Sequence, residues 1–316
     1  MSKLHYWLGS KLWSTANRMV RHAKDKGWIE AVQLPSRVIS VGNVQAGGTG
    51  KTPITIFLAK QAISKGLQVA ILTRGYRSIW EKTGGIISPL DTTPSPYLCG
   101  DEVALIREQV KDVWIGVGAD RIEQFEKLCS IASMRGERQF DIVILEDGFQ
   151  NYKIKKDLEI VTLTSEVFGE KLFRDELSAI EKNHLVVLTK GDYFPEGLNP
   201  ESPKVVVRYR YPKPAHDSYL FVCALADPLI AKGSLIKAGY QIKSMASFSD
   251  HHPYTVDEVR VLIKEADALN WRVLITGKDW VKWRDLGVLE GSVTVIEPEV
   301  EFVSGEDIWN EKVWNF

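Results

Sequence analysis

The distribution of apolar positions along the chain predicts alternating buried strands and helices. Short apolar runs typical of strands occupy residues 37–42, 67–73, 113–117, 140–145, 158–164 and 185–189. Between them, residues 50–65, 101–110 and 119–134 have the pattern of helices. Because near-continuous apolar strands alternating with helices are buried on both faces, we expect an α/β fold with a parallel sheet and helices on both sides.

A second, smaller alternating set follows a polar, proline-bearing stretch at residues 210–218 (RYPKPAHDS). It predicts strands at 219–225, 241–248 and 272–276, with helices that begin at Asp227 and Thr255. The sequence therefore predicts a smaller C-terminal α/β lobe after a linker. We expect an N-terminal helix in residues 1–30, a main domain in residues 31–212 and the smaller domain in residues 213–316.

The first thirty residues have the pattern of a basic amphipathic helix. Apolar residues recur near helical spacing: Leu4, Trp7, Leu8, Leu12, Met19 and Val20. The basic residues of the same segment are Lys3, Lys11, Arg18, Arg21, Lys24 and Lys26, and Asp25 is the one acid in residues 1–28. Such a helix suits either the headgroup layer of a membrane or packing on the protein core with its basic face in water, and these residues leave both interpretations open.

Composition adds few constraints on this picture. The chain has 316 residues, 44% hydrophobic and 26% charged, which is typical of a soluble globular protein with room for two domains. A net charge of −1 gives no reason to expect nucleic acid as a partner. The three cysteines lack metal or disulfide spacing, so we expect free thiols. We expect no signal peptide and no membrane-spanning segment, because no apolar stretch reaches about 18 residues.

The stretch VGNVQAGGTGKTP at residues 41–53 lies between a predicted strand and a predicted helix, the context that a phosphate-binding loop requires. The usual motif is G-x-x-x-x-G-K-[ST], and Gln45 stands where its first glycine is expected. The parts that contact phosphate are retained. We expect the nucleotide to be bound by Ala46, Gly47, Gly48, Thr49, Gly50, Lys51 and Thr52.

A second element of a nucleotide site follows the strand FDIVIL at residues 140–145, where Glu146 and Asp147 precede Gly148. Acidic residues at the end of a buried strand resemble a Walker-B element, and Mg²⁺ prefers oxygen ligands. We therefore expect the Thr52 hydroxyl with Glu146 and Asp147 to hold Mg²⁺ in a P-loop NTPase-type fold.

Further motifs occur in a fixed order: RGY at 74–76, GDE at 100–102, DR at 120–121, EDGFQN at 146–151, SFSDHH at 247–252 and TGKD at 276–279. Together with the glycine-rich loop, this set resembles the tetraacyldisaccharide 4'-kinase family of lipid A biosynthesis over nearly the whole chain. The resemblance implies two α/β lobes with the active site between them. It also implies ATP and Mg²⁺ as cofactors.

The expected activity is transfer of the γ-phosphate of ATP to the 4'-hydroxyl of an acylated glucosamine disaccharide 1-phosphate. The lipid substrate implies a peripheral enzyme at the cytoplasmic face of the inner membrane. We then expect the N-terminal helix to bind the membrane surface that holds this substrate. Two alternatives stay open. One is an ATP-dependent ligase with a soluble acid substrate, and the other is a nucleotide-dependent regulator without kinase activity.

The resemblance also assigns roles to individual residues. Asp101 matches the GDE position and is the expected base, His251 matches the first histidine of DHH and is expected to orient Asp101, and Lys51 completes the catalytic set. The basic positions expected to bind phosphate are Arg74, Arg121 and Arg174.

Three positions depart from the family pattern. Glu146 stands where the family usually has Asp. Asn151, which we expect at the substrate, stands where the family usually has His, and Asn cannot carry charge. Asp175, with Glu176 as the alternative, is the expected counterpart of a family Glu and a fourth expected metal ligand.

Overall fold

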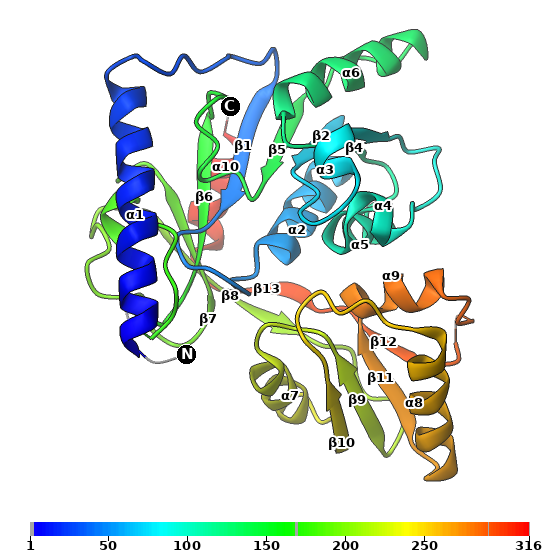
Figure 1. Ribbon diagram of the computed structural model, residues 1–316. Helices are drawn as coiled ribbons and strands as arrows, with labels where there is room; N and C mark the ends of the chain where they lie inside the picture. The colour runs from blue at the N-terminus through cyan, green and yellow to red at the C-terminus, as the bar shows by residue number, and fades with distance from the viewer. Residues whose placement is uncertain (1–2, 168–169, 290, 316) are drawn as a thin grey trace.

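The structure is a computed structural model that describes residues 3–167, 170–289 and 291–315. It has a large lobe, in the upper part of Figure 1, and a smaller lobe below it. None of the described helices is long and apolar enough to cross a membrane. The three cysteines are free thiols.

The large lobe is built on a sheet that, within the described residues, has nine strands in the order β13-β8-β7-β6-β1-β5-β2-β4-β3. The strands are β1 (Arg37–Gly42), β2 (Val69–Thr73), β3 (Gly85–Ile87), β4 (Trp114–Val117), β5 (Ile142–Glu146), β6 (Leu158–Thr164), β7 (Leu185–Lys190), β8 (Lys204–Arg210) and β13 (Glu299–Ser304). The pairs β3–β4 and β13–β8 are antiparallel, and the other neighbours are parallel.

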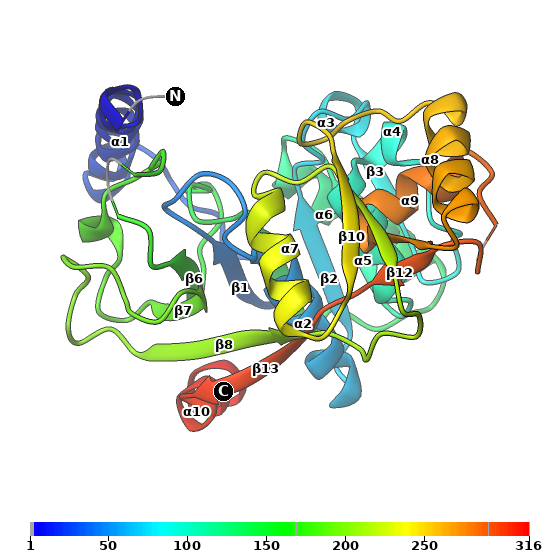
Figure 2. The same cartoon turned by 90° about the horizontal axis from the view of Figure 1, so that it is seen from below.

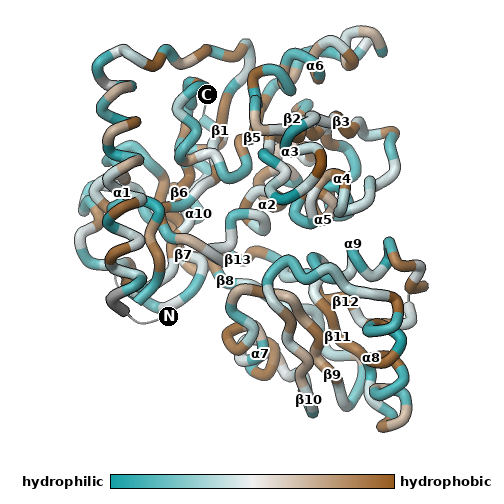
Figure 3. Tube along the Cα trace, in the orientation of Figure 1, coloured by the Kyte–Doolittle hydropathy of each residue, from teal (hydrophilic) through white to brown (hydrophobic). Residues whose placement is uncertain are grey.

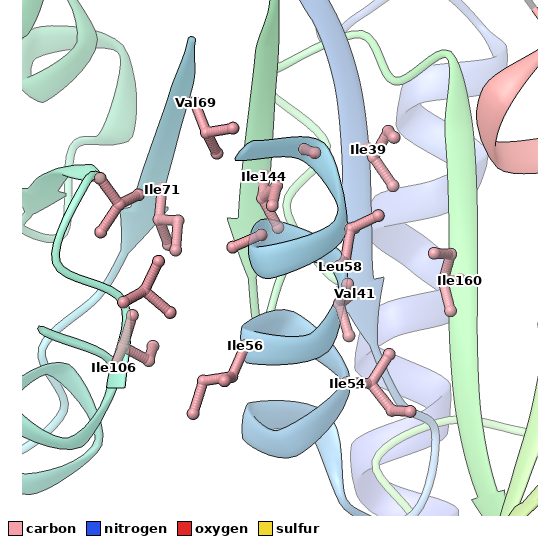
Figure 4. Packing of buried hydrophobic residues seen from close by; sticks show 14 of the residues in the cluster. Ile39, Val41, Ile54, Ile56, Leu58, Val69, Ile71, Ile106, Ile144 and Ile160 are labelled. Carbon is pink, nitrogen blue, oxygen red and sulfur yellow. The ribbon is translucent and has the colours of Figure 1, made fainter. Parts of the chain in front are cut away.

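Helices cover both faces of this sheet. One face packs against α2 (Lys51–Ser64), α5 (Asp101–Gln109) and α10 (Glu306–Trp314), and the other against α6 (Arg121–Met134). Figure 4 shows apolar side chains of α2, including Leu58, directed among strand residues such as Val41 and Ile144. The short helices are α3 (Trp80–Thr83), α4 (Pro96–Cys99) and the 3₁₀ turn η1 (Leu177–Ala179).

The small lobe has a parallel sheet of order β10-β9-β11-β12 in the described residues. Its strands are β9 (Tyr219–Cys223), β10 (Ile242–Ser247), β11 (Arg272–Thr276) and β12 (Thr294–Ile296). Helix α7 (Pro228–Lys237) packs on one face, and α8 (Val256–Ala268) and α9 (Gly277–Asp285) pack on the other. In both lobes the strands carry much of the apolar sequence (Figure 3).

The α/β fold predicted from the sequence is confirmed, and each predicted strand and helix of the two lobes lies within two residues of its predicted bounds. The C-terminal segment differs from the expectation. Residues 213–316 were expected to form one domain, but β13 pairs with β8 in the large sheet and α10 packs beneath it. The cause is the burial of apolar side chains against the core of the large lobe. On β13, Val300 and Phe302 alternate with Glu299 and Glu301, and Trp309 of α10 is fully buried.

Two chain segments therefore connect the lobes. Residues 211–218, most of the predicted linker, follow β8, and residues 297–298 precede β13. Figure 2 shows β8 and β13 side by side, with β8 leading to the small lobe and the antiparallel β13 returning from it. A pair of connections at one edge restricts how the lobes can move relative to one another.

The predicted N-terminal helix is α1 (Lys3–Asp25), at the edge of the large lobe away from α8 and α9 (Figures 1 and 2). It packs on the segment that follows β6: Ser10 Oγ accepts from the amide of Phe173 at 2.8 Å, and Asn17 Nδ2 donates to the carbonyl of Arg174 at 2.8 Å. Its large apolar residues point outward, with Leu12 77% and Met19 68% exposed.

Candidate nucleotide and acceptor site

A cleft of about 1540 Å³ lies between the two lobes. Large-lobe residues that line it include the glycine-rich loop and the ends of β2, β5 and β7, and small-lobe residues include the starts of α7 and α9. In open α/β sheets, ligands bind outside the carboxyl ends of the strands, so this cleft is the expected position for a substrate.

The glycine-rich loop connects β1 to α2 and has the backbone that close approach to phosphate requires. Gly47 and Gly50 have φ angles of 80° and 79°, in the left-handed region that favours glycine. A Cβ at Gly50 would also collide with the Tyr209 hydroxyl. All residues in the first turn of α2 are described, and none of them is acidic. Gly50, the N-cap residue, has no side chain that could cap the helix. The backbone amides of this first turn can therefore bind an anion.

Gln45, which replaces the outer glycine of the motif, fixes the loop to the neighbouring strand. Its side chain is fully buried, and Nε2 donates to the carbonyls of Thr164 at 3.1 Å and Glu166 at 2.8 Å. Its Oε1 accepts from the Thr164 amide at 2.8 Å. At the other side of the loop, Asn43 Nδ2 donates to Thr49 Oγ1 at 2.7 Å. A glycine at position 45 would give the backbone more conformational freedom, whereas the Gln45 side chain fixes the loop with three hydrogen bonds.

Lys51, Asp147 and Arg174 form a charge cluster at the start of α2. Lys51 Nζ lies 3.5 Å from Asp147 Oδ1, and Arg174 donates to both carboxylate oxygens of Asp147 at 3.0 and 2.8 Å. Burial opposes ionisation of Asp147, but Lys51 and Arg174 outweigh it and lower the pKa of this carboxyl. Asp147 also has a φ of 48°, a strained backbone position for a residue with a side chain.

Glu146 ends β5 one residue earlier and is more deeply buried. Its Oε2 accepts from Thr73 Oγ1 at 2.9 Å, and Arg121 donates to its carbonyl at 3.3 Å. Burial, with the carboxylates of Glu102 and Asp147 nearby, raises the pKa of Glu146. Its Oε1 has no hydrogen-bond partner among the described residues.

These groups fit a Mg²⁺–nucleotide complex. No cluster of three or more His, Cys, Asp or Glu side chains suited to a metal occurs in the described ranges. Mg²⁺ in nucleotide sites needs only one or two carboxylates, because phosphate oxygens and water complete its coordination. The unpartnered Oε1 of Glu146 and the charged carboxylate of Asp147 meet that requirement. Thr52, at the start of α2, lines the same cleft.

Asp101 and His251 meet across the two lobes. The Nδ1 atom of His251 lies 3.1 and 3.0 Å from the carboxylate oxygens of Asp101, and Lys278 and Lys282 approach Asp101 Oδ2 at 3.7 and 3.4 Å. Burial alone would raise the pKa of Asp101, but the hydrogen bond from His251 and the two lysine charges hold it well below its ordinary value. His251 lines the cleft with a φ of 65°, whereas Asp101 is 7% exposed and lies behind it.

The structure brings most of the expected site residues to one cleft. The expected residues that line it are Gly47, Gly48, Thr49, Gly50, Lys51, Thr52, Arg74, Arg121, Glu146, Asp147, Asn151, Arg174 and His251. Arg74 lies at the exposed side and pairs with Glu81 at 2.7 Å. Arg121 is buried, and its Nε has no partner in the described residues. Asn151 accepts from the Lys153 amide at 3.0 Å.

Asp175 is not part of this arrangement. It is fully buried, does not line the cleft, and forms an ion pair with Arg21 of α1. Burial raises the pKa of Asp175, and Arg21 opposes that rise. The side chain is held by α1, so the structure differs here from the metal-ligand role expected from the sequence. Its neighbour Glu176 pairs with Lys11 and Arg18 of the same helix.

Sequence reasoning missed several residues around the site. Lys278 and Glu102 lie within motifs that were noted, TGKD and GDE, but carried no assigned role. Lys282 lies one turn further along α9 from Lys278, which was a usable signal for a second cation on the same face. Trp13 and Asn17 of α1 also line the cleft, and their position follows from long-range packing alone.

A phosphate loop between a strand and a helix at the carboxyl edge of a parallel sheet is typical of P-loop NTPases, and the chain is of that class. Comparison with known proteins narrows the class. The model of the family described as "Tetraacyldisaccharide-1-P 4'-kinase" (LpxK) matches residues 3–315. The chain therefore belongs to the tetraacyldisaccharide 4'-kinase family.

Individual relatives agree with this assignment. The chain is 30% identical to the tetraacyldisaccharide 4'-kinase of Desulfatibacillum aliphaticivorans, over 81% of this chain and 77% of the relative. It is 29% identical to that of Chlorobium luteolum, over 81% of this chain and 79% of the relative. The crystal structure of LpxK from Aquifex aeolicus in complex with ATP has the same fold, with a TM-score of 0.73 at 22% identity, and the match covers 99% of this chain and 98% of that one.

Proposed function

We propose that the chain is an ATP-dependent kinase that transfers the γ-phosphate to the 4'-hydroxyl of a tetraacylated glucosamine disaccharide 1-phosphate. The observation that carries the proposal is the meeting of two groups across one cleft. The large lobe contributes the phosphate loop with Lys51 beside Asp147, and the small lobe contributes His251 against Asp101. Phosphoryl transfer needs both a held triphosphate and a group that receives the proton of the acceptor.

The loop amides and Lys51 would hold the phosphates of ATP, and Thr52 with Asp147 and Glu146 would hold Mg²⁺. When bound, Mg²⁺ neutralises charge that develops on the phosphate oxygens. Arg174 pairs with Asp147 in the described conformation, so its guanidinium is also within reach of a phosphate placed beside that carboxylate. Arg74 and Arg121 are the remaining cations that line the cleft near β2 and β5, and they suit phosphate groups of the donor or acceptor.

His251 is the member of the Asp101–His251 pair that faces the acceptor. A sugar hydroxyl loses its proton as the phosphorus–oxygen bond forms. Since Nδ1 lies against Asp101, Nε2 of the imidazole, 3.6 Å from Asp250 Oδ2, is the nitrogen that would take that proton, and the buried Asp101 carboxylate would stabilise the charge that results. This assignment exchanges the roles expected from the sequence, in which Asp101 was the base, because Asp101 is buried and its pKa is lowered.

The acceptor is a lipid, and α1 has features that suit a membrane surface. Its exposed side carries large apolar residues, and Trp13 and Asn17 connect that helix to the cleft. We therefore place the enzyme on the cytoplasmic face of the inner membrane, bound peripherally through α1. One amphipathic helix gives modest, reversible binding.

The membrane proposal is tested by sedimentation with anionic phospholipid vesicles. The double variant Leu12→Glu/Met19→Glu introduces charge on the exposed side of α1 and should lower the bound fraction. The control is Val261→Glu on α8, a residue 53% exposed on the other lobe, which should leave binding unchanged. Equal binding of all three proteins would contradict a membrane role for α1.

The kinase proposal is tested with purified protein, Mg²⁺, γ-labelled ATP and a tetraacyldisaccharide 1-phosphate. Label should appear in the lipid, and the product should carry a phosphate at the 4' position by mass spectrometry. Release of labelled inorganic phosphate that depends on an added soluble carboxylic acid, with no label in the lipid, would indicate a ligase. Binding of ATP without transfer to any acceptor would indicate a nucleotide-dependent regulator.

A further inference from the structure

The last two residues of β7 hold the carbonyls of consecutive residues in the glycine-rich loop. Lys190 Nζ donates to the carbonyl of Gly48 at 2.6 Å. Thr189 Oγ1 donates to the carbonyl of Thr49 at 2.9 Å, and it also lies 3.1 Å from the carbonyl of Leu163. Thr189 is buried, and both β7 residues line the cleft. None of the roles described above uses this pair.

The composition of the loop makes bonds from outside it important for its shape. Gly47, Gly48 and Gly50 allow phosphate oxygens to approach the backbone amides closely. The same glycines lose more conformational entropy than other residues when the loop is fixed in one shape. Within the loop, the amide of Thr49 donates to the carbonyl of Gly47 at 2.7 Å. Contacts from a neighbouring strand therefore decide how well the remaining amides stay directed toward a ligand.

Each bond to a loop carbonyl also sets the direction of an amide, because the C=O and N–H groups of a trans peptide unit point in opposite directions. The bond from Lys190 fixes the peptide unit that follows Gly48. The bond from Thr189 fixes the next unit, which carries the amide of Gly50 at the N-cap of α2. Both units belong to the part of the loop that is expected to surround the phosphates.

The ammonium of Lys190 is directed to the loop backbone, and a carboxylate of the small lobe lies near it. A Cβ added at Gly48 would lie 3.4 Å from Lys190 Nζ and 3.6 Å from Asp227 Oδ2, so both charged groups lie beside this glycine. Burial lowers the pKa of Lys190, and Asp227 opposes that effect. Lys51 is the lysine that the motif assigns to direct phosphate contact, whereas Lys190 contacts the loop itself.

We propose that Lys190 is a positioning residue of the phosphate loop, supported by Thr189. It holds the loop in its phosphate-binding shape before the nucleotide arrives, so that less conformational entropy is lost on binding. The inference rests on the proposed nucleotide site. Loss of Lys190 should raise the KM for ATP. The kcat at saturating ATP and the KM for the lipid should stay near their wild-type values, because bound phosphate restores the shape of the loop.

The test compares Lys190→Met with the wild type by calorimetric titration with Mg²⁺ and either a non-hydrolysable ATP analogue or tripolyphosphate. Affinity for the ATP analogue should fall by about tenfold or more, the usual effect of a lost hydrogen bond from a charged group. Affinity for tripolyphosphate should fall by the same factor, because the two ligands share the triphosphate. Thr189→Val should lower both affinities as well, and it keeps the test independent of whether Lys190→Met folds, which thermal melting measures.

Amide hydrogen exchange in the nucleotide-free protein reports on the loop directly. The peptide that contains residues 46–52 should exchange faster in Lys190→Met than in the wild type. The matched control is Lys171→Met, because Lys171 also lies beside the loop but its ammonium forms ion pairs with Glu166 and Asp227. This control removes an equal charge, and it should leave the exchange of the loop unchanged and lower nucleotide affinity less than Lys190→Met does.

Wild-type affinity or wild-type loop exchange in Lys190→Met would overturn the inference, and so would a loss of affinity equal to that of Lys171→Met. A loss for the ATP analogue alone would also overturn it, because Lys190 would then contact the base or the ribose. A wild-type protein that binds neither ligand would instead refute the proposed nucleotide site.

Discussion

Restoring the consensus glycine at position 45 should destabilise this protein. Gln45→Gly removes three buried hydrogen bonds, those to the carbonyls of Thr164 and Glu166 and from the Thr164 amide. At about 1 kcal/mol net for each bond, the loss is about 3 kcal/mol. The added backbone freedom of glycine in the unfolded chain contributes about 0.5–1 kcal/mol more.

The measurement is thermal and urea unfolding of Gln45→Gly beside the wild type, with Gln33→Ala as control. Gln33 is exposed and makes one hydrogen bond of 3.3 Å to the next residue, so its loss should change stability by less than about 0.5 kcal/mol. Nucleotide affinity should fall in Gln45→Gly, because the same bonds position the loop. A Gln45→Gly protein with wild-type stability and affinity would refute the argument that this side chain holds the loop.

Four further outcomes are expected. Lys51→Ala should abolish transfer, as measured by label transfer, because its ammonium is the cation expected to bind the β- and γ-phosphates. Stability should be retained in thermal melting, because Asp147 keeps its ion pair with Arg174. His251→Ala should lower kcat by about 10²–10⁴ with little change in nucleotide affinity, the range for a lost general base. In urea unfolding, Arg21→Ala should lower the free energy of unfolding by about 2 kcal/mol or more, because it leaves the buried carboxylate of Asp175 unpaired. The double variant Arg21→Ala/Asp175→Asn should lose less stability, because it removes that charge as well. Burial lowers the pKa of His184 from 6.5 to about 4, so the unfolded chain binds the extra proton and stability should fall by about 2 kcal/mol from pH 7 to pH 5 in urea unfolding, an effect that His184→Gln should remove.

The sequence predicted the elements that local pattern determines. Residues 158–164 form a short run rich in apolar and β-branched residues, which favours a strand, and β6 has those bounds. The phosphate loop was recognisable because its chemistry requires particular residues in consecutive positions. The pairing of Asp101 with His251, suggested by motifs 150 residues apart, is present between the lobes.

What the sequence could not predict depends on long-range contacts. The burial of Asp175 against Arg21 arises because α1 packs on the segment after β6, and no local pattern near Asp175 encodes that neighbour. The position of β13 has the same origin. Its alternation marks a strand with one buried face, but pairing with β8 is decided by the exposed edge of the large sheet.

The place of β13 and α10 in the large sheet has a consequence for biosynthesis. The edge strand and one covering helix of the catalytic lobe are encoded after the whole small lobe. The large sheet therefore cannot be completed until the small lobe has been synthesised, whereas the small lobe is contiguous from β9 to β12. A premature stop codon that spares every phosphate-binding residue would still leave β8 as an open edge, a template for aggregation.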